Sequence, residues 1–201
     1  MENKAYVLRK SFAGSGQSPL EEVPDSQGLW IFGYGSLMWD PGFLFSRSYP
    51  AVLIGYHRRF SVYSNGSYGC PTSPGLALGL HRGGSCRALI FQIAAKNEEN
   101  TLAYLDRRES AYLRKKVKVS VGKGGFIEAI TYIVNPQHPR YAGFLHKRET
   151  ARLILNGTGS KGSSLGYLEK TVSELERQGM LKSNMHDLLD TVRAFAASAE
   201  T

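Results

Sequence analysis

The sequence lacks several features that would assign it to a particular class of protein. It has two cysteines among 201 residues, Cys70 and Cys86, and their spacing is not typical of a metal site. No run of about 18 apolar residues occurs, so we expect no membrane-spanning segment. The N-terminal residues lack the continuous apolar stretch of a secretion signal. We therefore expect a reduced, cytoplasmic protein, with a Cys70–Cys86 disulfide as the alternative.

Other familiar signatures are also missing. The histidines show no ligand-type spacing, so we expect no metal site. The segment 157–162, GTGSKG, lacks the spacing of a phosphate-binding loop and is expected to connect two helices. Ser36 and Cys70 have no identifiable base in a recognised motif, which leaves a serine or cysteine hydrolase as a weak alternative.

The charge is basic but scattered. The chain has 25 Lys and Arg against 17 Asp and Glu, a formal net charge of +8. Such a balance suits either nucleic acid or small anionic substrates. The basic clusters are short, and no RNA-binding aromatic motif accompanies them. We expect a small-molecule substrate, with neither nucleic acid nor a membrane as partner.

Strand patterns fill the first two-thirds of the chain and helical patterns the last third. Residues 1–28 are polar and rich in Gly and Ser, which predicts a flexible extension before a single domain over 29–201. Strands are predicted over 29–34, 51–64, 75–82, 86–94, 113–121 and 126–134, with turns at Gly83–Gly84 and Gly122–Gly125. Helices are predicted over 97–109, 147–155, 164–179 and 183–198. This order predicts an α+β fold around a largely antiparallel sheet or barrel.

The segment LWIFGYGSLMWDP, residues 29–41, runs from a predicted buried strand into Gly33-Tyr34-Gly35-Ser36. Glycines there allow a sharp turn and let a ligand approach the main chain. Successive N–H groups in such a turn can bind an anion or a carbonyl oxygen. Taken alone, the motif favours a plain turn after a strand over a ligand-binding turn.

This segment resembles the signature of the ChaC family, the glutathione-specific γ-glutamylcyclotransferases. The resemblance continues in VLIGYHRRFSVYS, PTSPGLALGLHRGGSCRALIFQI, YLDRRE, AITYIVNPQHPRYAG and GYLEKTVSELERQGM, in the family's order, over most of 29–193. It implies a γ-glutamylcyclotransferase-like mixed barrel with helices packed around it. It also implies cleavage of glutathione by attack of its own α-amine on its γ-carbonyl, which yields 5-oxoproline and cysteinylglycine without metal or cofactor.

The resemblance assigns roles to particular residues. Glu109, at the end of YLDRRE, matches the family's catalytic glutamate, which takes a proton from the α-amine and delivers one to the leaving nitrogen. We expect partial burial to raise its pKa; read without the family, Glu109 would be a solvated residue paired with Arg108 or Lys115. The family's 5-oxoproline-binding loop corresponds to Ile31, Phe32, Gly33, Tyr34, Gly35, Ser36 and Leu37.

Further candidates follow from the residues near these motifs. Arg58 and Arg59 lie on opposite faces of a predicted strand, so at most one can face the site, and we take Arg59 as the one that meets a substrate carboxylate. Asp106 is expected to pair with an arginine. Ser64 and Tyr112 either line the site or lie on the surface.

The sequence leaves several alternatives open. The segment after Glu109 is shorter than is common in the family, so other γ-glutamyl amines or amino acids remain possible substrates. A binding or regulatory protein that keeps the pocket without catalysis is the alternative of another class. The oligomeric state is not indicated.

Overall fold

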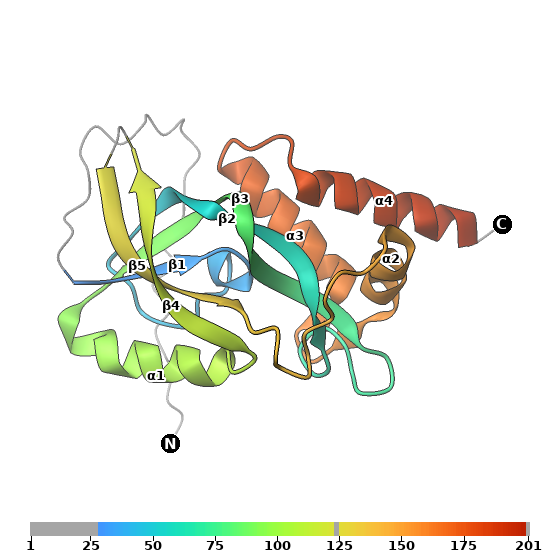
Figure 1. The fold of residues 1–201 in the computed structure, drawn as a ribbon, viewed down its shortest axis with the longest axis horizontal. Coiled ribbons are helices and arrows are strands. Elements are labelled where there is room, and N and C mark those ends of the chain that lie inside the picture. The colour runs from blue at the N-terminus through green and yellow to red at the C-terminus, as the bar shows by residue number, and fades with distance from the viewer. Residues whose placement is uncertain (1–27, 123–124, 200–201) are drawn as a thin grey trace, which may run out of the picture.

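A closed barrel of five strands, in the order β1-β3-β2-β4-β5, forms the centre of the fold (Figure 1). The computed structural model describes residues 28–122 and 125–199. The barrel strands are β1 Leu29–Gly33, β2 Arg47–Ser64, β3 Gly75–Ile93, β4 Tyr112–Val121 and β5 Gly125–Val134. β1 pairs antiparallel with β3 and parallel with β5, so the barrel is mixed. The predicted α+β class and mixed barrel are confirmed.

Helices lie on two sides of this barrel. Helix α1 lies at one side, and α2, α3 and α4 form a group at the other (Figure 1). Their bounds are α1 Glu98–Arg108, α2 Lys147–Asn156, α3 Ser164–Arg177 and α4 Asn184–Ala199. Short elements join them: the 3-10 helices η1 Ser36–Met38 and η2 Ala95–Asn97, and the two-residue strands β6 Thr158–Gly159 and β7 Gly162–Ser163. The four predicted helices are therefore all present.

The predicted turn at Gly83–Gly84 is wrong, because β3 runs through it. β3 stays paired with β2 on both sides of these glycines, and the register shifts between Ile54 and Tyr56. Gly55, Gly83 and Gly84 all have positive φ angles, of 83°, 97° and 68°. Glycines with positive φ serve a bulge as well as a turn, and the sequence does not distinguish the two. A bulge of this kind bends the strands and increases their local twist.

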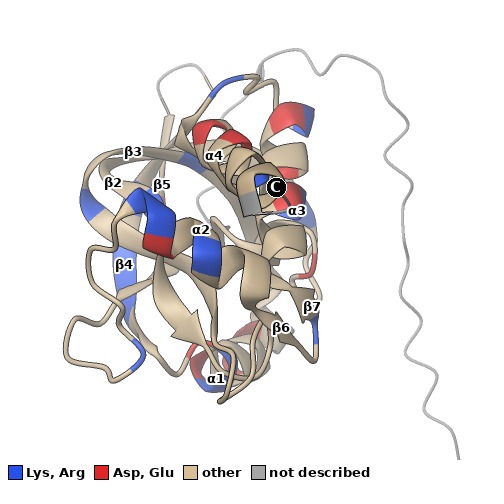
Figure 2. Cartoon of the chain, turned by 90° about the vertical axis from the view of Figure 1, so that its right-hand side faces the viewer, with Lys and Arg blue, Asp and Glu red and all other residues tan. Residues whose placement is uncertain are grey.

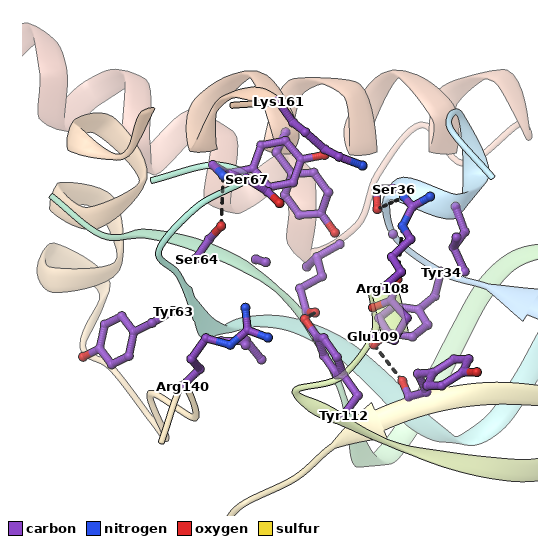
Figure 3. Close-up of a pocket in the computed structure, with 18 of the residues that line it drawn as sticks. Tyr34, Ser36, Tyr63, Ser64, Ser67, Arg108, Glu109, Tyr112, Arg140 and Lys161 are labelled. Carbon is purple, nitrogen blue, oxygen red and sulfur yellow. Dashed lines mark hydrogen bonds and ion pairs between the residues drawn. The ribbon is translucent and has the colours of Figure 1, made fainter. Parts of the chain in front are cut away.

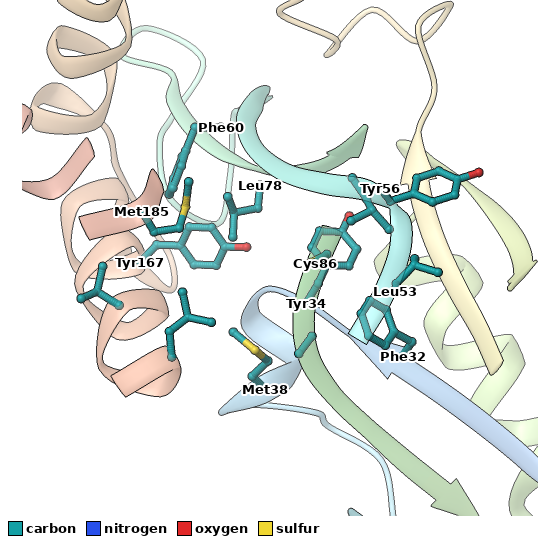
Figure 4. Close-up of a cluster of buried hydrophobic side chains, with 14 of the residues drawn as sticks. Phe32, Tyr34, Met38, Leu53, Tyr56, Phe60, Leu78, Cys86, Tyr167 and Met185 are labelled. Atoms are coloured by element: carbon teal, nitrogen blue, oxygen red, sulfur yellow. The ribbon is translucent and has the colours of Figure 1, made fainter. Parts of the chain in front are cut away.

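The hydrophobic core extends from the barrel to the helices. Tyr167 of α3 packs where the barrel and the helices meet (Figure 4). The Tyr167 ring stacks on Tyr68 with centroids 4.5 Å apart and meets Phe60 edge-on at 5.6 Å. It also lies 5.3 Å from the ring of Trp39. The helix group and the loop after β1 are thus packed together through one aromatic side chain.

Charged residues are spread over the molecule, and Figure 2 shows Lys and Arg on strands and helices alike. Within the described residues, no helix is both long enough and apolar enough to cross a membrane. Cys70 and Cys86 are free thiols. Apart from Gly28, the predicted N-terminal extension lies outside the described residues.

Candidate active site

A pocket opens where the turn after β1, the end of α1, strand β2 and the β6–β7 hairpin meet (Figure 3). The turn contributes Tyr34, Gly35 and Ser36, and the end of α1 contributes Arg108 and Glu109. These two segments are more than seventy positions apart in the sequence. The closed barrel brings them together, since β1 lies between β3 and β5.

Glu109 follows the last residue of α1 as its C-cap, and its backbone N–H donates to the Leu105 carbonyl at 2.8 Å. Its side chain is 17% exposed, and Oε1 lies 3.4 Å from Nε of Arg108. Burial raises the pKa of the Glu109 carboxyl, while Arg108, Lys161 and Arg140 act in the opposite direction. The predicted burial and the predicted direction of the pKa shift are confirmed. A carboxyl of raised pKa can exchange a proton nearer to neutral pH than a solvated glutamate.

Arg108 joins the helix end to the turn. Its Nη1 donates to the carbonyl oxygens of Asp40 and Pro41 at 2.8 and 3.1 Å, and its Nη2 donates to Oγ of Ser36 at 3.0 Å. The guanidinium is mostly buried, with 11% of the side chain exposed. Several charge-assisted hydrogen bonds from one planar group fix geometry strongly. Arg108 therefore sets where the turn lies relative to Glu109.

The two glycines of the turn are required by packing rather than by an empty space for a ligand. A Cβ on Gly33 would lie 2.7 Å from Cβ of Leu37, and a Cβ on Gly35 would lie 2.5 Å from Oη of Tyr167. Such distances are too short for a carbon side-chain atom. The expectation that these glycines open the main chain to a ligand therefore needs correcting: protein atoms occupy the space that each glycine leaves. Glycine at 35 admits the Tyr167 hydroxyl, which lines the pocket.

Buried tyrosine hydroxyls surround Glu109. The hydroxyl of Tyr34 donates to the Tyr132 carbonyl and that of Tyr112 to the Leu78 carbonyl, each at 2.8 Å. Burial raises the pKa of both phenols, with a smaller contribution from the nearby carboxylate of Glu109. Both hydroxyls therefore stay neutral. Because their protons are committed to carbonyls, their oxygens remain available as acceptors for a bound ammonium.

Two more cations reach the pocket from distant segments. Lys161 lies in the β6–β7 hairpin, with Nζ 3.5 Å from Oδ2 of Asp40. Arg140 lies in the loop between β5 and α2. With Arg108, they surround Glu109 with positive charge, an environment that suits a substrate bearing carboxylates.

The structure brings most of the predicted loop to the pocket, but not all of it. Phe32, Tyr34, Gly35, Ser36 and Leu37 line the cavity. Ile31 is fully buried in a separate apolar cluster with Leu37 and Phe91, and Gly33 faces the same two side chains. We therefore do not retain Ile31 and Gly33 as residues that touch a substrate.

Arg59 also does not line the pocket. Its Nη2 donates to the Gly143 carbonyl at 3.3 Å and lies 3.4 Å from Nδ1 of His81, and its guanidinium lies over the Phe144 ring. Arg58 is the inward residue of the pair, as strand alternation requires, but its guanidinium contacts Cys86 rather than the cavity. The geometry gives no support to a substrate-binding role for Arg59.

Other expectations are resolved by contacts. Asp106 pairs with Arg114 at 2.8 Å, as expected, and accepts a hydrogen bond from Tyr132 at 2.7 Å. Ser64 and Tyr112 both line the pocket. Sequence reasoning missed Arg108, Arg140, Lys161 and Tyr167 as site residues. Arg108, Arg140 and Tyr167 lie within matched segments, and Arg108 directly precedes Glu109; Lys161 lies outside these segments.

Comparisons with known proteins agree with this arrangement. A family model described as ChaC-like protein matches residues 29–195. The chain is 33% identical over 177 residues to the "Glutathione-specific gamma-glutamylcyclotransferase" of Escherichia coli (strain K12), covering 87% of this chain and 77% of the relative. It is 31% identical over 169 residues to "Glutathione-specific gamma-glutamylcyclotransferase 1" of Homo sapiens, covering 81% and 76%.

A solved structure shares the fold. The selenomethionine-labelled γ-glutamyl cyclotransferase specific to glutathione from yeast matches with a TM-score of 0.77 and 21% identity, over 84% of this chain and 96% of that chain. At that identity the likeness concerns the fold alone. The barrel and the surrounding helices are therefore an arrangement already seen in a solved structure.

Proposed function

Because the chain belongs to the ChaC-like family, we propose that it is a γ-glutamylcyclotransferase that converts glutathione to 5-oxoproline and cysteinylglycine. The main structural support is the buried carboxyl of Glu109, in the same pocket as the turn formed by residues 34–37. A base and a set of backbone donors in one cavity are what an internal acyl transfer requires.

The first step is removal of a proton. The α-amine of the γ-glutamyl group carries a proton at neutral pH and cannot attack until it loses it. Glu109 takes that proton, since burial makes its carboxylate a better base than a solvated glutamate. The oxygens of Tyr34 and Tyr112 accept hydrogen bonds from the ammonium before transfer, because their own protons point to carbonyls.

The second step closes the ring. The free amine attacks the γ-carbonyl carbon of the same molecule, so the protein mainly has to hold the γ-glutamyl arm in its folded conformation. Negative charge grows on the carbonyl oxygen, and backbone N–H groups of residues 34–37 stabilise it. Glu109 then gives its proton to the amide nitrogen as that bond breaks. The ring nitrogen loses its second proton, and the amine of cysteinylglycine takes one up, so the protons balance. The products are 5-oxoproline and cysteinylglycine, with no water, metal or cofactor consumed.

The proposal includes the cellular setting. We propose that the protein acts in the cytoplasm as a metal-free enzyme on a small-molecule substrate. The two free thiols, Cys70 and Cys86, are typical of proteins from a reducing compartment.

The experiment is direct. The purified protein is incubated with glutathione and, separately, with γ-glutamyl-alanine, and products are identified by mass spectrometry. 5-Oxoproline with cysteinylglycine supports the proposal; turnover of only the dipeptide points to a cyclotransferase for other γ-glutamyl compounds, and turnover of neither points to a binding protein. Glu109→Gln is expected to lower kcat by about 100- to 10,000-fold. The matched control is Glu128→Gln, which removes an exposed carboxylate paired with Lys116.

A further inference from the structure

The three cations of the pocket differ in what they already bind. Arg108 contacts Glu109, Ser36 and two carbonyl oxygens, and Lys161 pairs with Asp40. The guanidinium of Arg140 makes no hydrogen bond or ion pair with any residue that the structure describes. It is half-buried and lines the cavity. An unpaired guanidinium facing a pocket is a ready site for a carboxylate.

The main chain around Arg140 is held firmly. Its carbonyl accepts from the Tyr63 N–H at 2.8 Å, and its own N–H donates to Nδ1 of His138 at 3.1 Å. The next residue, Tyr141, forms a bridge with Val62 of β2, and the Ala142 N–H donates to the Ser61 carbonyl at 2.9 Å. The loop is therefore fixed along β2, while the guanidinium of Arg140 has no partner among the residues that the structure describes. A fixed main chain that carries an unpaired cation is preorganised to bind a ligand.

The position of Arg140 relative to Glu109 identifies the group it can meet. In Figure 3, Arg140 lies beside Tyr63, across the pocket from Ser36 and Arg108. Of the three cations that act on Glu109, Arg108 has the largest effect and Arg140 the smallest. The reacting γ-glutamyl end must lie at Glu109, so Arg140 lies toward the other end of the substrate. A Cys-Gly segment spans about 7 Å when extended, so the glycine carboxylate lies well away from the reacting carbonyl.

We propose that Arg140 binds the carboxylate of the C-terminal glycine of glutathione, and that it thereby selects γ-glutamyl tripeptides over γ-glutamyl amines. This inference rests on the proposed function. Arg140 is a specificity residue, since it meets the part of the substrate that leaves as cysteinylglycine and takes no part in proton transfer. The pairing is charge-assisted and fits the fork of a guanidinium.

The test uses two substrates that differ only at that carboxylate: glutathione and its C-terminal glycinamide. Both keep the α-amine, the α-carboxylate and the scissile bond. Arg140→Gln is expected to lower kcat/KM for glutathione by about 10- to 100-fold, mainly through KM, and for the amide by less than about threefold. Arg140→Lys keeps the positive charge but not the planar fork. Its kcat/KM for glutathione is expected to lie between those of the unmodified protein and Arg140→Gln. The matched control is Arg82→Gln, which removes one positive charge from an exposed position of β3 outside the pocket.

The outcomes separate the two proposals. A small change in the Glu109 pKa affects both substrates alike, so it cancels in the ratio of their kcat/KM values. Equal losses on glutathione and on the amide overturn the assignment of Arg140 and leave the proposed function standing. If the unmodified protein turns over no glutathione, the proposed function is overturned and this inference with it. The turnover of the amide by Arg140→Gln also shows that the variant is folded.

Discussion

Arg108 donates a hydrogen bond of 3.0 Å from Nη2 to Oγ of Ser36, across 72 positions of sequence. The same guanidinium lies 3.4 Å, through Nε, from the carboxylate of Glu109. The Arg108 side chain therefore sets the distance between Glu109, the proposed base, and the turn proposed to bind the carbonyl oxygen. A change in that distance lowers the rate of an internal attack steeply, because the reacting atoms need a near-attack geometry.

Arg108→Lys is the first prediction. Lysine keeps a positive charge near Glu109 but cannot reach Ser36 and the carbonyls of Asp40 and Pro41 with one planar fork. We expect kcat/KM for glutathione to fall by about 10- to 100-fold and the free energy of unfolding by about 1–3 kcal/mol. Steady-state kinetics and denaturant unfolding measure the two effects. Arg107→Lys, at the exposed neighbouring position, is the control, and equal behaviour of the two variants contradicts the prediction.

Gly35→Ala is the second prediction, and it has a designed rescue. The new methyl group would lie 2.5 Å from Oη of Tyr167, which costs about 1–3 kcal/mol of stability. Tyr167→Phe removes that oxygen, and the nearest remaining atoms, the Cζ of residue 167 and a Leu78 methyl, are 3.7 Å away. The double variant is therefore expected to be more stable than Gly35→Ala alone. A thermal-unfolding double-mutant cycle measures the coupling; independent effects of the two changes would show that the hydroxyl is not the obstacle.

The third prediction concerns stability and pH. The folded-state pKa of Glu109 is raised above its ordinary value of 4.5, so between these two values the folded chain holds a proton that the unfolded chain has released. Stability contributed by this group therefore falls as pH rises through that window. Glu109→Gln removes the titration, so its melting temperature is expected to match that of the unmodified protein at acidic pH and to exceed it at neutral pH. A difference between the two melting temperatures that stays constant with pH contradicts this.

Lys161→Gln is the fourth prediction. Lys161 lowers the pKa of Glu109, so removing its charge raises that pKa further. The acidic limb of the kcat/KM profile reports the base in the free enzyme and is expected to move to higher pH. Lys116→Gln, which removes an equal charge from the exposed face of β4, is expected to leave the limb in place. If the acidic limb of Lys161→Gln stays at the pH of the unmodified protein, Lys161 does not influence the pKa of Glu109 and the prediction is wrong.

The sequence predicted the parts of this molecule that depend on local patterns. The helices and most strands follow from apolar periodicity, and the burial of Glu109 was expected once its motif was matched. The continuous β3 was not expected, since the dihedral freedom of Gly83 and Gly84 serves a turn and a bulge equally. Strand alternation indicated only that at most one of Arg58 and Arg59 faces the site; it assigns the two to opposite faces but does not show what lies opposite each face.

The rest of the site could not be predicted, because it depends on contacts between distant segments. Lys161 belongs to a Gly-rich segment interpreted as a connection, and only the pairing of β6 with β7 brings it to the pocket. Arg140 follows Pro136 and Pro139 in a loop without periodicity, and its position comes from the bridge between Tyr141 and Val62. Such placements are tertiary, and no window of local sequence contains them.

Ile31 of β1 pairs with Ile130 of β5, so the active site cannot assemble until β5 has been synthesised. The turn after β1 is attached to β5 by Thr131 Oγ1 donating to the Phe32 carbonyl, a contact that spans 99 positions. The cavity then still lacks Lys161 and Tyr167, which follow later. A nascent polypeptide that ends before these residues therefore has its base and its turn but no finished cavity. Catalytic competence arrives near the end of synthesis, and fragments cut before α3 are expected to be inert.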